Sequence, residues 1–187
     1  IALFLDSPPD LLAHPLHAVV RAPLVRARVV LPGMLERAQA TFVNLSSASG
    51  YAEGMAPAGD GEYDVGYGIS KAAFQRVAVF LACGLVPRGI RAYNIQPGLI
   101  ATERIGQDMA EFGIENVGAP GETVSRTVAW LLANPDEAKQ YDGLNIEAQF
   151  FCHEHGLLEG WDGPNPNEAP IRYDLSGAKL AQLEADL

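Results

Sequence analysis

A tyrosine and a lysine four residues apart, Tyr67 and Lys71, are the residues of this chain best placed to do chemistry. Positions four apart lie on one face of a helix, so the phenol and the ammonium group point the same way. A free phenol has a pKa of about 10, too high for acid–base work at neutral pH, and a lysine cation beside it lowers that pKa. Such a tyrosine can pass a proton to or from an alcohol or carbonyl oxygen. The spacing alone is weak evidence, because such pairs occur by chance on many helices.

Two flanking segments strengthen this interpretation. Upstream, residues 41–47 read TFVNLSS, and downstream, residues 89–102 read GIRAYNIQPGLIAT. A strand ending in Ser-Ser, then Tyr-x-x-x-Lys on a helix, then a strand ending in Pro-Gly-x-x-x-Thr resembles the short-chain dehydrogenase/reductase family. The resemblance covers roughly residues 1–149 in the family's order. It implies an oxidoreductase that transfers hydride between NAD or NADP and an alcohol or carbonyl substrate.

The resemblance assigns catalytic roles to three side chains. Tyr67 would donate or accept the hydroxyl proton, and Lys71 would lower the pKa of the tyrosine and hold the nicotinamide ribose hydroxyls. Ser47 would hydrogen-bond the substrate oxygen and stabilise charge as hydride moves. Two alternatives stay open. Tyr63 lies one turn earlier but has no lysine four residues on, and Ser46 precedes Ser47 at the same strand end.

A second group of residues would contact the cofactor. Pro97, Gly98, Ile100 and Thr102 resemble the segment of the family that packs on nicotinamide. Backbone groups near Ile100 and the Thr102 hydroxyl would hold the carboxamide. The alternative is a plain turn that ends a strand. The choice between NAD and NADP is open, because the discriminating residues of the family follow a strand that has no counterpart here.

The chain departs from the family pattern at three places. Twenty residues separate Ser47 from Tyr67, more than the family usually has. Val19 occupies the position of a helical Asn that supports a water chain to the lysine, and residues 6–9 (DSPP) replace Asn-Asn-Ala-Gly. The longer gap alters the wall of the pocket, and the other two departures bear on proton relay and adenosine packing. Together with the missing nucleotide-binding half, these two favour an alternative hypothesis, a degenerate relative that acts as a non-catalytic binding or interaction subunit.

The cofactor pyrophosphate site of the family is missing from this sequence. No Gly-x-x-x-Gly-x-Gly or Gly-x-Gly-x-x-Gly turn follows a strand in the 187 residues, and the chain starts at Ile1 rather than at a methionine. We therefore expect the C-terminal part of a family member. Alone, this part would bind dinucleotide weakly and be inactive, because the glycine-rich turn and its helix N-terminus form the main anion site.

Apolar runs and breakers predict alternating elements. Strands are expected at residues 1–5, 39–45, 90–95 and 144–151, and helices at residues 10–37, 65–85, 122–133 and 176–187. Such alternation indicates parallel strands joined by crossover helices, hence an α/β fold. It would represent the last four strands of a Rossmann-like doubly wound sheet. The expected domain spans residues 1–159, and residues 160–187 form a loop and a short helix.

Some details of these elements are also predicted. In the helix at residues 10–37, Asp10 is a candidate cap, and Pro15 and Pro23 predict a kink or a later start. Residues 101–118 read as a loop with helical turns, and the resemblance implies that this loop closes over the substrate. Its apolar residues weakly favour a partly apolar substrate: Ile105, Met109, Phe112 and Ile114.

Composition excludes several function classes. The chain is 48% hydrophobic and 19% charged, which is typical of a globular protein, and its net charge of −10 argues against nucleic acid and anionic membranes as partners. The longest uncharged apolar stretch, residues 77–86, is short for a membrane span. Two cysteines, Cys83 and Cys152, are expected to be buried thiols, which fits a reducing cytoplasmic setting.

Two other site hypotheses have little support. Residues 152–155 read Cys-His-Glu-His, but ligands this close in sequence rarely all reach one metal ion, so a strand end near the pocket mouth is the preferred interpretation. A hydrolase built on Ser47 would need a Gly-x-Ser-x-Gly turn, and none occurs. No metal site is therefore predicted.

Two strongly apolar helical segments predict self-association. Residues 77–83 and residues 24–31 leave apolar surface that one sheet face cannot fully cover. Members of the family often dimerise by packing these two helices into a four-helix bundle. We expect a homodimer or homotetramer with Phe80 near the interface. The alternative is burial of this surface by the C-terminal tail.

Overall fold

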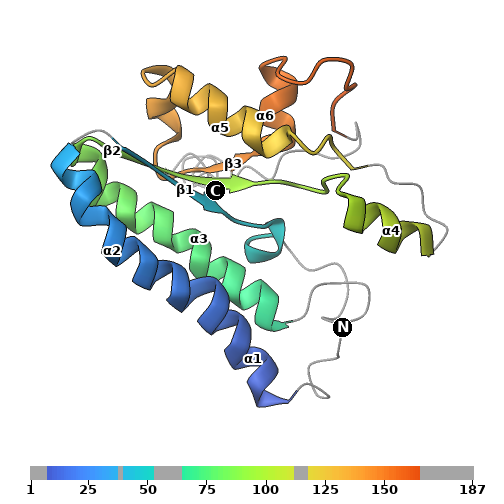
Figure 1. Cartoon of the computed structure of the whole chain (residues 1–187), viewed down its shortest axis with the longest axis horizontal. Coiled ribbons are helices and arrows are strands. Elements are labelled where there is room, and N and C mark those ends of the chain that lie inside the picture. The colour runs from blue at the N-terminus through green and yellow to red at the C-terminus, as the bar shows by residue number, and fades with distance from the viewer. Residues whose placement is uncertain (1–7, 38–39, 53–64, 112–117, 165–187) are drawn as a thin grey trace, which may run out of the picture.

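The computed structural model describes residues 8–37, 40–52, 65–111 and 118–164. The expected strand at residues 1–5, the helix at residues 176–187 and Tyr63 lie outside the described residues. Within the described part, a parallel sheet has the order β1-β2-β3, made of β1 (Ala40–Leu45), β2 (Ile90–Gln96) and β3 (Asn145–Glu147). Figure 1 shows helices on both faces of this sheet, with α1, α2 and α3 on one side and α5 and α6 on the other.

The first helical run was expected to be one helix that is kinked or starts late. It consists of α1 (Pro9–Pro15), a π-helical segment η2 (Leu16–Arg21) and α2 (Ala22–Arg37). The wider π turns lie between Pro15 and Pro23, where the missing proline N–H groups disturb the regular ladder. The capping prediction for Asp10 was wrong, because Pro8 is the cap residue, and Asp10 lies within the first turn.

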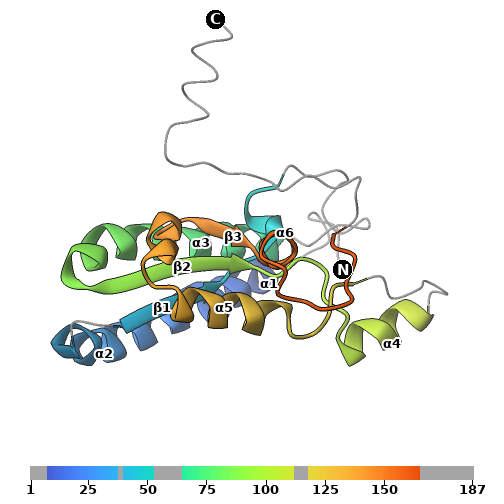
Figure 2. The ribbon, with the colours of Figure 1, turned by 90° about the horizontal axis from the view of Figure 1, so that it is seen from above.

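The next helix, α3 (Val65–Leu85), has the bounds that its apolar run predicted. It continues into a 3₁₀ turn, η4 (Val86–Arg88), and packs on β2. The stretch Val65–Arg88 is long and apolar enough to cross a membrane by length and composition alone, and 33% of its most apolar window is buried. Core helices of soluble proteins pass the same test, and α3 lies against the sheet beside α2 (Figures 1 and 2).

The strand expected at residues 144–151 is much shorter than predicted. Only β3 is extended, and the chain then enters α6 (Ala148–Glu154). Ala148, Phe151 and Cys152 are buried at helical spacing, so the apolar run after Glu147 follows a helix. Cys152 is therefore in a helix and not at a strand end, which corrects that interpretation. Among the described residues, no group of His, Cys, Asp and Glu has a metal-binding arrangement.

Three further helical elements belong to the second half of the chain. They are α4 (Glu103–Glu111), within the segment expected to contain helical turns, α5 (Thr123–Ala133), and the 3₁₀ helix η5 (Glu137–Tyr141). The prediction of two buried thiols was half wrong: Cys152 is buried, but Cys83 is exposed on α3.

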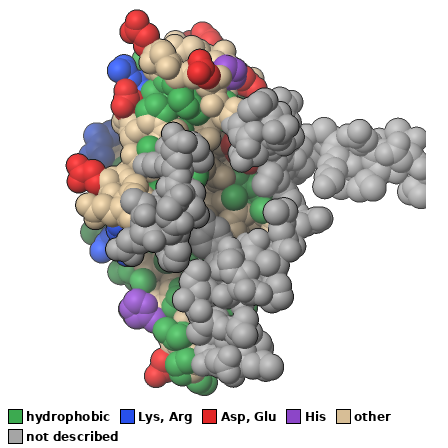
Figure 3. All heavy atoms as spheres, turned by 90° about the vertical axis from the view of Figure 1, so that its right-hand side faces the viewer, with side chains coloured by type: hydrophobic (Ala, Val, Ile, Leu, Met, Phe, Trp, Pro, Cys, Tyr) green, Lys and Arg blue, Asp and Glu red, His purple; other side chains and the backbone are tan. Residues whose placement is uncertain are grey.

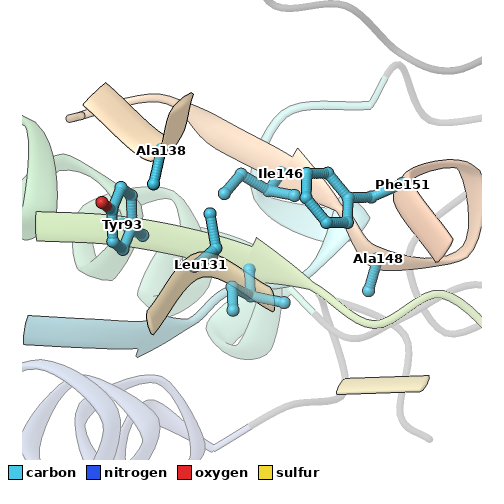
Figure 4. Packing of buried hydrophobic residues seen from close by; sticks show 7 residues of the cluster. Tyr93, Leu131, Ala138, Ile146, Ala148 and Phe151 are labelled. Atoms are coloured by element: carbon cyan, nitrogen blue, oxygen red, sulfur yellow. The ribbon is translucent and has the colours of Figure 1, made fainter. Parts of the chain in front are cut away.

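The core lies on both faces of the sheet. One cluster joins β2 and β3 to α5, η5 and α6 (Figure 4), with these buried members: Tyr93, Ile95, Leu131, Ala138, Ile146, Ala148 and Phe151. A second cluster, Met34, Leu85 and Ile90, joins α2 and α3 to the start of β2. Because the three strands are parallel, their carboxyl ends lie at the same edge of the sheet.

Candidate active site

The carboxyl ends of the three strands form one edge of the sheet, where ligands bind in open α/β folds. Ser46 and Ser47 follow β1, Pro97 follows β2, and α6 follows β3. The Ser46 amide donates to the Ile95 carbonyl at 2.9 Å, so the serine segment still follows β2 beyond the end of β1. Figure 3 looks at the molecule from the side toward which the β2 arrow of Figure 1 points. Acidic, basic and hydrophobic side chains are interspersed on the described part of that view.

Helix α3 brings Tyr67 and Lys71 to this edge. The Lys71 ammonium lies 5.6 Å from the centre of the Tyr67 ring, which confirms that the two side chains share a face. It donates a hydrogen bond of 3.1 Å to the carbonyl of Leu45, the last residue of β1. Burial lowers the pKa of the Lys71 ammonium below its ordinary value. This hydrogen bond ties the Lys71 side chain to a backbone carbonyl two residues before Ser47.

Two buried asparagines hold α3 in this position, and sequence reasoning missed their role. Asn44 and Asn94 are partners across β1 and β2, and the Asn44 amide donates to the Asn94 side-chain oxygen at 2.8 Å. Asn44 also donates to the Phe74 carbonyl at 3.0 Å, and Asn94 to the Gln75 carbonyl at 2.8 Å. The sequence does contain a signal for this role, because an asparagine occurs within each of two mostly apolar strands, at Asn44 and Asn94.

The two candidate serines differ in their surroundings. Ser46 is 3% exposed, and its hydroxyl donates to the Asn145 side-chain oxygen at 2.9 Å. Ser47 is half-buried and precedes the 3₁₀ turn η3 (Ala48–Gly50), where its hydroxyl oxygen accepts a bond from the Ser49 hydroxyl at 3.0 Å. Because Ser47 accepts that bond, its own O–H can donate to another group. The geometry therefore favours Ser47 over Ser46 as the side chain that meets a substrate.

A polar network beside the serines was not predicted. The Tyr51 hydroxyl donates to the Glu147 carboxylate and accepts from the Asn145 amide, both at 2.9 Å. Burial, and after it the charge of Glu147, raises the pKa of the Tyr51 phenol well above its ordinary value. Tyr51 and Glu147 are 96 residues apart in sequence, so no local pattern could join them.

The predicted nicotinamide segment forms a tight turn supported by α6. Gly98 has a φ of 74°, and a Cβ there would lie 2.2 Å from the Gln149 side-chain nitrogen. That nitrogen donates to the Leu99 carbonyl at 2.9 Å. The positive φ therefore favours glycine at this position, and a side chain there would displace the end of Gln149.

The following residues retain hydrogen-bonding groups that suit a carboxamide. Ile100 pairs with Ala119 in a parallel bridge, in which the Ala119 amide donates to the Leu99 carbonyl and the Ala101 amide donates to the Ala119 carbonyl. Within the described chain the Ile100 N–H therefore donates no hydrogen bond. The Thr102 hydroxyl oxygen accepts from the Ile105 amide at 3.2 Å, which leaves its O–H as a donor. These two donors, with Pro97 and Gly98 before them, are compatible with nicotinamide.

The fold and this arrangement of residues define a class of protein. Residues 11–111, more than half of the chain, match the short chain dehydrogenase family. The chain therefore belongs to this family, and the expected α/β fold is confirmed.

Individual relatives and solved structures show how much of the chain is similar to known proteins. The chain is 30% identical over 113 residues to 2-keto-3-deoxy-L-fuconate dehydrogenase of Xanthomonas campestris pv. campestris, which covers 60% of the chain and 36% of that relative. L-sorbose reductase from Gluconobacter frateurii, complexed with NADPH and L-sorbose, has a TM-score of 0.65 at 19% identity, covering 78% of this chain and 59% of the other. 4-hydroxyisoleucine dehydrogenase complexed with NADH has a TM-score of 0.61 at 21% identity, and the match covers 79% of this chain and 61% of the other. The chain thus spans about a third of that curated relative and about 60% of these structures.

Proposed function

We propose that the full-length protein carrying this sequence transfers hydride between NAD or NADP and the carbinol or carbonyl carbon of a small alcohol or ketone. The observation that supports this most is the Lys71 ammonium, which lies 5.6 Å from the Tyr67 ring while bonded to the Leu45 carbonyl at the end of β1. The names of the relatives, which include a sugar reductase and a sugar-acid dehydrogenase, favour a hydroxylated substrate.

The side chains divide the work as follows. The Ser47 O–H donates to the substrate oxygen, and the Tyr67 hydroxyl exchanges a proton with that oxygen. Lys71 supplies positive charge beside the tyrosine ring and, with the Ile100 amide and the Thr102 hydroxyl, provides donors for a nicotinamide nucleoside. The cofactor, when bound, accepts or supplies the hydride.

The test is the substitution Tyr67→Phe, which keeps the ring and removes the exchangeable proton. Turnover in the full-length protein should fall about 10²–10⁴-fold, the range typical of acid–base groups. Turnover is measured as the absorbance change of NAD(P)H with an alcohol or ketone found by screening. Tyr141→Phe is the matched control, since Tyr141 packs on Trp130 and Phe151 in the core, and it should keep its turnover. Unchanged turnover of Tyr67→Phe would rule out the assignment.

The second candidate function is a non-catalytic subunit. The observation that favours it is Val19, half-buried in η2 against α3, where the family has an amide side chain that supports proton relay. On this hypothesis Lys71→Ala leaves dinucleotide binding unchanged. On the proposed function it weakens binding, because Lys71 holds the ribose hydroxyls. Calorimetric titration of the wild type and of the Lys71→Ala variant with NADH and NADPH distinguishes the two hypotheses.

We further propose a cytoplasmic location. The exposed Cys83 and the buried Cys152 are both unpaired, which suits a reducing compartment. Measuring the enzyme activity in the fractions of a disrupted cell would test this location.

A further inference from the structure

The segment that carries Ser47 is hydrogen-bonded to β3 on both sides of that residue. On one side Ser46 donates to Asn145, and on the other Tyr51 donates to Glu147. Asn145 connects these two hydrogen bonds into one network, because its amide donates to the Tyr51 hydroxyl at 2.9 Å. The short η3 turn between the two sides is a 3₁₀ helix of three residues. The position of Ser47 therefore depends on these bonds to a strand about 100 residues away.

The same turn packs directly on the helix that carries the tyrosine and the lysine. A Cβ added at Gly50 would lie 2.8 Å from the Lys71 carbonyl carbon and from the Ala72 nitrogen. The turn is thus confined between the α3 backbone at Lys71 and the polar end of β3. A change at either contact would move Ser47 relative to the Tyr67 and Lys71 side chains.

We propose that Tyr51, held by Asn145 and Glu147, is a positioning residue that fixes the Ser47 hydroxyl for the reaction. The inference rests on the proposed function, since it assumes that Ser47 meets the substrate. Tyr51 touches no reacting atom in this role. Its hydroxyl holds the C-terminal side of the serine turn against β3, so that Gly50 remains seated on α3.

The test is a double-mutant cycle on kcat in the full-length protein, with the screened substrate. Tyr51→Phe keeps the ring and removes the hydroxyl together with its bonds to Glu147 and Asn145, and it should lower kcat about 10- to 100-fold, as a misplacement of about 1 Å does. In a Ser47→Ala background the same substitution should cause no further loss, because there is no hydroxyl left to position. Tyr141→Phe should change kcat in neither background.

A second pair of variants tests the same bond without touching the tyrosine. Glu147→Gln retains a side-chain oxygen that can accept from Tyr51, so its kcat should stay near that of the wild type. Glu147→Ala removes the acceptor and should reproduce the loss of Tyr51→Phe. NADH dissociation constants should be the same in all variants, since the positioned group belongs to the substrate side.

Several outcomes would overturn the proposal. Equal losses for Tyr51→Phe with and without Ser47 would show a general structural role. An unchanged kcat in Tyr51→Phe and Glu147→Ala, while Tyr67→Phe loses turnover, would refute the positioning role and leave the proposed function intact. An unchanged kcat in Tyr67→Phe would refute the proposed function, and the positioning role with it.

Discussion

At the residue scale, the buried phenol of Tyr93 couples stability to alkaline pH. Tyr93 is 1% exposed on β2, and burial, followed by the charge of Asp142, raises the pKa of its phenol to about 12. The Arg91 guanidinium acts in the opposite direction. The folded chain therefore keeps a proton that the unfolded chain releases near its ordinary pKa of about 10.

This pKa shift predicts a loss of stability in alkali. The contribution of Tyr93 to the free energy of unfolding should be steady below about pH 10 and fall, by on the order of 1–3 kcal/mol, as the pH rises toward 12. Urea unfolding at pH 9, 10 and 11 measures the slope. Tyr93→Phe should flatten it in part, because the raised pKa of Tyr51 contributes in the same direction. An identical slope in wild type and Tyr93→Phe would contradict the prediction.

At the element scale, the placement of α3 depends on polar contacts as well as on apolar packing. Lys71 reaches the end of β1, while Asn44 and Asn94 donate to successive carbonyls of the helix one turn later. Both asparagines are almost fully buried, at 1% and 0% exposed. Such bonds have a direction and a length, so they fix the helix along its axis better than apolar contacts alone.

Removing one of these contacts should therefore be costly. Asn44→Ala leaves the Asn94 oxygen and the Phe74 carbonyl without their donor, and we expect a loss of on the order of 1–3 kcal/mol in the free energy of unfolding. The matched control is Asn134→Ala, which removes a bond to the Trp130 carbonyl within the end of α5 and should cost less. Urea unfolding of both variants at neutral pH makes the comparison. Equal losses would argue against a special role for the asparagine pair.

At the scale of the whole molecule, exposed apolar side chains gather on the side of α2 and α3. Val29 is 74% exposed and Phe80 is 69% exposed, with Val25 and Val30 each more than half exposed. The two helices lie side by side on one face of the sheet (Figure 1). A self-complementary patch of this kind suits a two-fold dimer.

We therefore expect the full-length protein to be a homodimer or homotetramer, which Phe80→Glu should dissociate. The matched control is Leu132→Glu on α5, an exposed apolar residue on the other face of the sheet, which should leave the assembly unchanged. Light scattering at about 50 µM, well above the dissociation constant of a stable dimer, measures the mass of each protein. A monomeric wild type, or a Phe80→Glu protein with the mass of the wild type, would refute this interface.

Features that depend on near neighbours in the chain could be predicted from the sequence. The bounds of α3 followed from its apolar run, the shared face of Tyr67 and Lys71 followed from their spacing, and the parallel pairing of β1 with β2 followed from the helix between them. The family resemblance also rested on such short motifs. Each of these properties is set by backbone periodicity within a few turns or strands, which a single chain displays directly.

Which distant groups meet became clear only from the folded structure. The bonds of Tyr51 to Glu147, of Ser46 to Asn145 and of Lys71 to the Leu45 carbonyl join residues that no local pattern connects. The break between β3 and α6 was missed because a short apolar run suits a buried strand and a buried helix equally well. The exposure of Cys83 was missed for a related reason. An apolar helix has several faces, and which of them is covered depends on the elements that pack around it.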